Sequence, residues 1–68
     1  MADRETTGAG PDRFTLRQLI DEAQREAFMR RRVYPRQVET GRLTQKDADM
    51  RIDLMEAIAA RLKRVAGL

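Results

Sequence analysis

Residues 39–48, ETGRLTQKDA, contain the end of one helix and the start of the next. Gly41 is suited to the left-handed conformation that follows the last turn of many helices, because it has no Cβ atom. Thr44 is a good helix N-cap, and Asp47 stands where a carboxylate favours the positive end of the helix dipole. A connection this short makes the two helices antiparallel neighbours. The segment therefore predicts an all-α fold built on an antiparallel helical hairpin.

The first helix is predicted over residues 15–40. Its start has Thr15 as N-cap, Gln18 three residues later as the second half of a capping box, and Phe14 placed to pack on Leu19. Apolar residues then recur at spacings of three and four, which is typical of a helix that buries one face. These residues are Leu16, Leu19, Ile20, Ala23, Ala27, Tyr34 and Val38.

Pro35 interrupts the first helix. A proline inside a helix lacks the N–H that would bond to the preceding turn, and its ring clashes with the carbonyl four residues back. The helix must therefore kink or break near Tyr34. We expect a kink, because Tyr34 and Val38 keep the apolar stripe in phase across the proline.

The second helix is predicted over residues 44–66 and has two apolar stripes. The first has the heptad spacing of a coiled-coil seam. It consists of Ala48, Ile52, Met55, Ala59, Leu62 and Ala66. The second, beside it, is Leu54, Ile58 and Val65. Together they are wider than one partner helix covers, so the sequence predicts an apolar face left over for another contact.

The size of the chain favours an oligomer. A domain of 68 residues buries little apolar surface, and this one has neither cysteine nor histidine for a disulfide or a zinc site. We expect residues 13–68 to form the hairpin and to dimerise into a four-helix bundle. Residues 1–12, which contain Gly8, Gly10 and Pro11 and no apolar period, are predicted to be a disordered tail.

Enzymatic chemistry is not expected. The chain has no histidine, cysteine or serine, which excludes nucleophilic triads and imidazole acid–base catalysis. Asp49, Asp53 and Glu56 share one face of the second helix and could hold a divalent ion with help from the first helix. A solvated acidic face, balanced by nearby bases, is the interpretation we favour. We therefore predict no catalytic, metal or cofactor site and no small-molecule substrate.

A cluster of arginines near the bend is a candidate nucleic-acid site. Twelve of the fourteen basic residues are arginine, whose planar group suits phosphate and carboxylate partners. The cluster consists of Arg30, Arg31, Arg32, Arg36 and Arg42. Salt-dependent contact with phosphates is one interpretation, and pairing with acids around the bend is the other. Acids precede bases by four residues at Asp21 and Arg25 and at Glu26 and Arg30, which predicts ion pairs along the helix.

The predicted surface for a protein partner or for the dimer draws on both helices. Tyr34 either fills the kink or is an exposed anchor, and Phe28, which lies off the main stripe, marks the surface if it is exposed. The candidate residues are Phe28, Val33, Tyr34, Val38, Leu54 and Ile58. The sequence thus predicts a non-enzymatic protein-interaction module, with an accessory nucleic-acid-binding protein as the alternative.

Membrane insertion is not predicted. The longest apolar runs are far shorter than the roughly 20 residues that span a bilayer, and the first residues lack the apolar stretch of a signal peptide. We expect a cytoplasmic protein.

The stretch MRRRVYPRQVETGRLTQKDADMRIDLMEAIAARL, residues 29–62, resembles small uncharacterised helical proteins encoded by phages and prophages. The shared features are a centre of the form R-x-V-Y-P-x-x-V-x-x-G-x-L-T and a following MEAI-like helix. The resemblance covers about half of the chain. It implies a short helical protein of mobile-element origin, and it brings no activity and no catalytic residues. The surplus apolar face is what predicts pairing with a second copy or with a host or phage protein.

Overall fold

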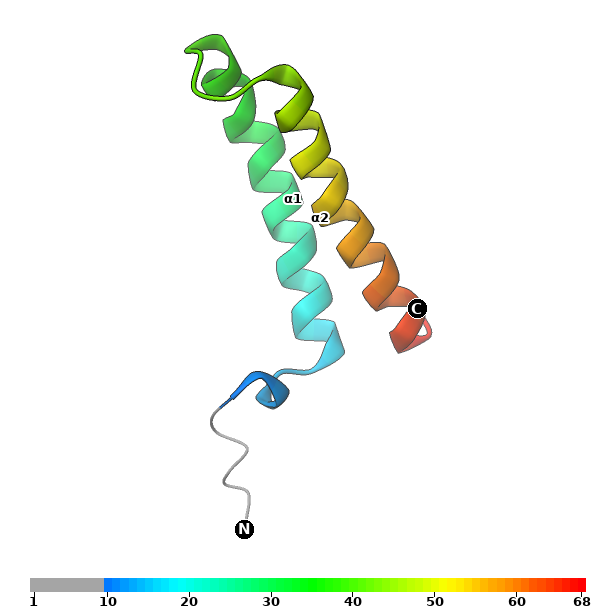
Figure 1. The fold of residues 1–68 in the computed structure, drawn as a ribbon. Coiled ribbons are helices and arrows are strands. Elements are labelled where there is room, and N and C mark those ends of the chain that lie inside the picture. The colour runs from blue at the N-terminus through cyan, green and yellow to red at the C-terminus, as the bar shows by residue number, and fades with distance from the viewer. Residues whose placement is uncertain (1–9) are drawn as a thin grey trace.

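The computed structural model describes residues 10–68, which form two long helices packed side by side (Figure 1). Helix α1 spans Leu16–Glu39 and helix α2 spans Gln45–Ala66, and a 3-10 turn, η2, spans Pro11–Arg13. The two helices run in opposite directions and are joined by the short turn at the top of Figure 1. The all-helical fold is therefore confirmed. Most of the predicted tail, residues 1–9, lies outside the described residues.

The end of the predicted tail has local structure. Gly10 adopts a left-handed φ of 87°, and Pro11 follows at the first position of η2, where its fixed φ suits a helical turn. One long hydrogen bond of 3.4 Å, from the N–H of Arg13 to the carbonyl of Gly10, closes this turn. Residues 10–13 therefore form a turn before α1 begins.

The start of α1 has the predicted capping box. The N–H of Gln18 donates to Thr15 Oγ1 at 3.1 Å, and the N–H of Thr15 donates to Gln18 Oε1 at 2.9 Å. Phe14 and Leu19 line one hollow beside this cap. Leu19 remains 39% exposed, so its predicted place in the buried stripe is wrong. It lies at the edge of the stripe, next to the fully buried Ile20.

Helix α1 does not break at Pro35. It runs without interruption from Leu16 to Glu39. Tyr34 and Val38, on either side of the proline, are half-buried and share a hollow with Ala48 and Ile52 of α2. Packing against α2 on both sides of Pro35 offsets the missing backbone hydrogen bond. A bend at this position stays a prediction.

The turn between the helices joins two well-formed caps. Gly41 has a φ of 80°, its N–H donates to the carbonyl of Val38 at 3.1 Å, and the N–H of Arg42 donates to the carbonyl of Gln37 at 2.9 Å. These two bonds form a Schellman motif at the end of α1. Thr44 then caps α2, where its Oγ1 accepts from the N–H of Asp47 at 3.1 Å.

Replacing Gly41 with alanine tests the turn. No atom lies within 4 Å of the position that a Cβ would take, so the cost is one of backbone conformation alone. We expect Gly41→Ala to lower the free energy of unfolding by about 1–2 kcal/mol. Gly41→Asn, which tolerates the left-handed region better, should lose less. Urea denaturation followed by circular dichroism measures both, and an unchanged midpoint for Gly41→Ala would contradict the role given to this glycine.

The core between the helices is narrow and made mostly of alanine. The buried residues are Ile20, Ala23, Ala27, Ala48 and Ala59. The predicted seam of α2 is confirmed, because its other members are half-buried: Ile52, Met55, Leu62 and Ala66. The second stripe of α2 lies outside this core. The hairpin is thus a single layer of two helices, 51 × 24 × 14 Å between its extremes, whereas stable domains usually pack two layers.

Candidate protein-interaction surface

Two consecutive arginines of α1 reach α2 on opposite sides of the helix–helix seam. Arg30 Nη1 donates to the carbonyl of Arg51 at 2.8 Å, and Arg31 Nε donates to Glu56 Oε2 at 3.0 Å. Successive residues of a helix point about 100° apart. Arg30 and Arg31 therefore lie on either side of the seam. They identify the two broad sides of the hairpin, which we call the Arg51 side and the Glu56 side.

The Arg51 side has a patch of exposed apolar side chains. The contact between Arg31 and Glu56, together with the hollow in which Tyr34 and Val38 lie beside Ile52 and Ala48, indicates the register of the helices. Because the helices are antiparallel, residue numbers rise along α1 in the direction in which they fall along α2. Two residues on from Arg31 and two back from Glu56, Val33 therefore lies level with Leu54. We define the apolar patch as Met29, Val33, Leu54 and Ile58. Ile58 lies one turn from Leu54, and Met29, four residues before Val33 and nine after the buried Ile20, lies at the outer margin of the patch. Each of the four is between 42% and 54% exposed. Val33, Leu54 and Ile58 are three of the predicted interface residues.

The Glu56 side has a groove between the helices instead. Its volume is about 370 Å³, and Phe28 is its most exposed apolar wall, at 57%. The other lining residues are Gln24, Ala27, Arg31, Glu56, Ala59, Ala60 and Lys63. Phe28 is exposed, as the surface prediction requires, but the structure places it across the seam from Val33, Leu54 and Ile58.

Tyr34 and Val38 lie in neither exposed surface. Both are half-buried and line a smaller hollow of about 220 Å³ near the turn, with Pro35 between them. Their apolar parts pack toward Ala48 and Ile52. Of the two interpretations of Tyr34, the structure matches the one in which its ring fills space beside the proline.

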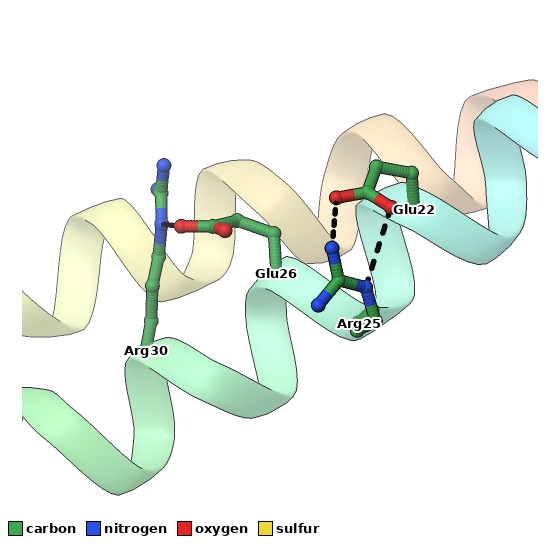
Figure 2. Close-up of polar contacts among 4 residues, drawn as sticks. All are labelled: Glu22, Arg25, Glu26 and Arg30. Carbon is green, nitrogen blue, oxygen red and sulfur yellow. Dashed lines mark hydrogen bonds and ion pairs between the residues drawn. The ribbon is translucent and has the colours of Figure 1, made fainter.

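The arginine cluster is divided between two tasks. Arg30 is half-buried and donates to Glu26 at 2.9 Å as well as to α2, and Figure 2 shows its side chain beside Glu26. Arg31 pairs with Glu56 across the helices, and this hydrogen bond raises the pKa of the Arg31 guanidinium. Both groups therefore connect α1 to α2.

The remaining three arginines stay open to solvent. Arg32 lies over the ring of Phe28, 5.7 Å from its centre, and Arg36 and Arg42 lie near the turn. Within residues 10–68, none of these three has an acidic partner. They are the part of the cluster that remains available to an anionic ligand.

The predicted pairing of Asp21 with Arg25 is wrong. Arg25 instead donates to both oxygens of Glu22, at 3.3 Å and 2.8 Å (Figure 2). Residues three and four apart are both neighbours on a helix, and exposed pairs differ little in energy, so their spacing alone does not choose between them. The predicted pair of Glu26 and Arg30 is confirmed.

The acidic face of α2 is engaged in polar contacts. Glu56 accepts from Arg31, and Asp49 accepts from Gln45 Nε2 at 2.9 Å. Over the part of the chain that the structure describes, no three acidic, histidine or cysteine side chains gather as metal ligands would. Arg31 and Gln45 are thus the partners that the structure gives to this face.

No family model, curated protein or solved structure matches this chain. Among residues 10–68, neither long helix has the run of apolar residues needed to cross a membrane.

Proposed function

We propose that this chain is a non-enzymatic protein-interaction module that pairs through the apolar patch. In this proposal a second copy supplies the missing layer and completes a four-helix bundle. The observation that carries it is the patch itself: four large apolar side chains, two from each helix, at matching levels and about half exposed. Contiguous patches of this kind mark interaction surfaces on soluble proteins.

The size of the hairpin supports the same proposal. Among residues 10–68 the only fully buried large side chain is Ile20. The other buried residues of a lone hairpin are alanines, and larger seam residues such as Ile52, Met55 and Leu62 stay half-buried. Stable protein interfaces cover about 800 Å² on each partner. A broad side of 51 × 24 Å has room for such an interface, and its apolar centre would then become a core.

The charges beside the patch are compatible with self-pairing. Residues seven apart lie on the same helix face, about two turns away. On this criterion Glu26 flanks Val33, Arg36 flanks Met29, and Arg61 flanks Leu54. Two symmetric arrangements of the pair are possible. If the turns of the two copies lie at opposite ends of the bundle, Glu26 faces the partner's Arg36. If the turns lie at the same end, Glu26 faces the partner's Arg61.

Arg51 is the exception to this complementarity. It lies seven residues before Ile58. In both symmetric arrangements of the pair, the side chain of Arg51 faces an arginine of the second copy. A long arginine side chain lays its stem along the surface while the guanidinium turns to water, so this contact is tolerated.

The biological setting is part of the proposal. The resemblance of residues 29–62 to small phage and prophage proteins is the reason to propose a module of mobile-element origin that acts in the cytoplasm. The same apolar patch would also serve a host or phage protein as partner, and it would bury the same side chains.

Sedimentation equilibrium of the purified chain tests the pairing. We expect the apparent mass to rise with concentration from that of one chain to that of two, because burial of the patch drives association. A folded protein that keeps the mass of one chain over the whole concentration range would contradict the proposal.

The open arginines favour a second candidate, an accessory nucleic-acid-binding function. Affinity for duplex DNA or RNA should fall steeply with salt, because phosphate contacts release counterions. Arg32→Glu combined with Arg36→Glu should weaken binding at least tenfold, since each change turns an attraction into a repulsion. Glu22→Gln, which alters charge away from the turn, is the control. Absence of binding at low salt would end this candidate.

A further inference from the structure

The groove on the Glu56 side remains open when the apolar patch is covered, because the two lie on opposite sides of the seam. The exposed Ala60 lines it, above a floor formed by the buried Ala27 and Ala59. Phe28 stands beside them as an aromatic wall that is 57% exposed. The groove therefore offers a foreign apolar side chain an aromatic ring and the methyl group of Ala60 over a shallow apolar floor.

The ends of the groove are polar. Arg31 and Glu56 lie at one end, and Gln24 and Lys63 lie seven residues further along each helix. This spacing makes the groove about 10 Å long, which suits one bulky side chain and its neighbours.

The free charge at the groove is positive. The only carboxylate among the lining residues, Glu56, is already held by Arg31. Lys63 is half-buried, and within residues 10–68 no acid pairs with it. Arg32 adds a positive charge above the ring of Phe28, and the carboxylate of Asp53, which acts on Arg31, adds a negative one at the Arg31 end of the groove. Lys63 is therefore the charge left over for a ligand. A ligand that carries a carboxylate beside its apolar group would complement this arrangement.

We propose that this groove is a docking site for an acidic peptide segment of another protein. The segment inserts one phenylalanine-sized or leucine-sized side chain against Phe28 and the alanines, and it places a carboxylate on Lys63. Such anchors in partly desolvated pockets dominate the affinity of many interfaces. Through this second surface the proposed bundle would connect its own pairing to capture of a different protein.

A nucleic-acid strand fits the groove less well. A strand bound by stacking needs a groove that follows its backbone, with cations available for successive phosphates. This groove is only about 10 Å long, and Arg31 is occupied by Glu56. That leaves Arg32 and Lys63 as the cations near the ring of Phe28. The arrangement therefore favours an apolar anchor with a single carboxylate.

Two matched synthetic peptides test the proposal. Both are short and fluorescein-labelled with one central phenylalanine, and the flanking residues are glutamate in one and lysine in the other. Fluorescence anisotropy should show that the glutamate peptide binds the full chain at least tenfold more tightly. Phe28→Ala should weaken that binding roughly tenfold, through loss of the apolar wall. Lys63→Glu should reverse the preference between the two peptides.

Val65→Ala is the matched control, because Val65 is 72% exposed and lies outside the groove, and it should leave the affinity unchanged. Phe28 is itself exposed, so Phe28→Ala should keep the helical circular dichroism spectrum. Equal affinity for the two peptides, or affinity that ignores Phe28 and Lys63, would overturn the proposal. Tight binding of single-stranded oligo(dT) that competes with the peptide and is lost in Lys63→Glu would also overturn it.

The two proposals can be tested independently. Peptide affinity tests the docking groove, and the sedimentation mass of the unmodified chain tests the pairing through the apolar patch. A monomer that still prefers the glutamate peptide would contradict the proposed pairing but not the docking site. A dimer that binds neither peptide would contradict the docking site but not the pairing.

Discussion

Leu54→Asp combined with Ile58→Asp is expected to separate the proposed dimer into single chains. In a lone hairpin both side chains are already about half exposed, so two aspartates there would change folding stability little. In the proposed bundle the same substitution puts four carboxylates into an apolar interface. Burying unpaired charge costs several kcal/mol for each group. We therefore expect the dissociation constant to rise by more than about a thousandfold.

Sedimentation equilibrium measures this change, and a matched control is available across the seam. Gln24→Asp combined with Ala60→Asp adds the same charge at two exposed residues of the groove on the Glu56 side. Both residues lie across the seam from the apolar patch. This control should remain dimeric. If both double variants sediment like the unmodified chain, the patch is not the interface.

Ile20→Ala is expected to cause the largest loss of stability from a single substitution. Ile20 is 0% exposed, and the other buried side chains are alanines. Removing it takes away the only large side chain among residues 10–68 that is fully buried and leaves a cavity between the helices. Such changes cost about 2–5 kcal/mol in well-packed cores, and small domains have few kcal/mol to lose.

Thermal and urea denaturation at a fixed chain concentration would measure the loss, because dimerisation makes stability depend on concentration. Val65→Ala is the control: Val65 is 72% exposed, so its change should stay within about 0.5 kcal/mol. An Ile20→Ala variant that unfolds at the same midpoint as the control would show that the helices do not pack around Ile20.

The local features of the hairpin could be predicted from the sequence, because each depends on a few neighbouring residues. Each helix cap forms through contacts between residues three apart: Thr15 and Gln18 at the start of α1, and Thr44 and Asp47 at the start of α2. Gly41 takes the left-handed conformation that a residue with a Cβ avoids. The seam of α2 follows equally from spacing, since a heptad repeat keeps one face toward one neighbour.

The meeting of faces between the two helices could not be predicted in the same way. Phe28 and Val33 lie five residues apart on α1, about 140° around the helix, so helical spacing alone already argues against placing both in one surface. Spacing does not tell which face of α2 meets which face of α1, because the register between the helices decides this. That register is visible in the contact of Arg31 with Glu56 and in the hollow that Tyr34 and Val38 share with Ile52 and Ala48. No sequence signal distinguishes these long-range contacts from solvated arginines.

Several smaller differences have energetic causes. Arg25 pairs with Glu22 and not with Asp21. Exposed ion pairs at these two spacings differ in free energy by only a few tenths of a kcal/mol, so sequence spacing does not determine the partner. Helix α1 continues through Pro35 because residues on both sides of it pack on α2. In each case the local preference is weak, and the surroundings decide the outcome.

Isotope-filtered nuclear Overhauser spectroscopy on a mixture of labelled and unlabelled chains tests the central claim most directly. If a second copy covers the patch, the methyl groups of Val33, Leu54 and Ile58 will show contacts between chains. Intermolecular contacts that fall on Phe28 and Ala60 instead, or none at a concentration where the hairpin is folded, would contradict it.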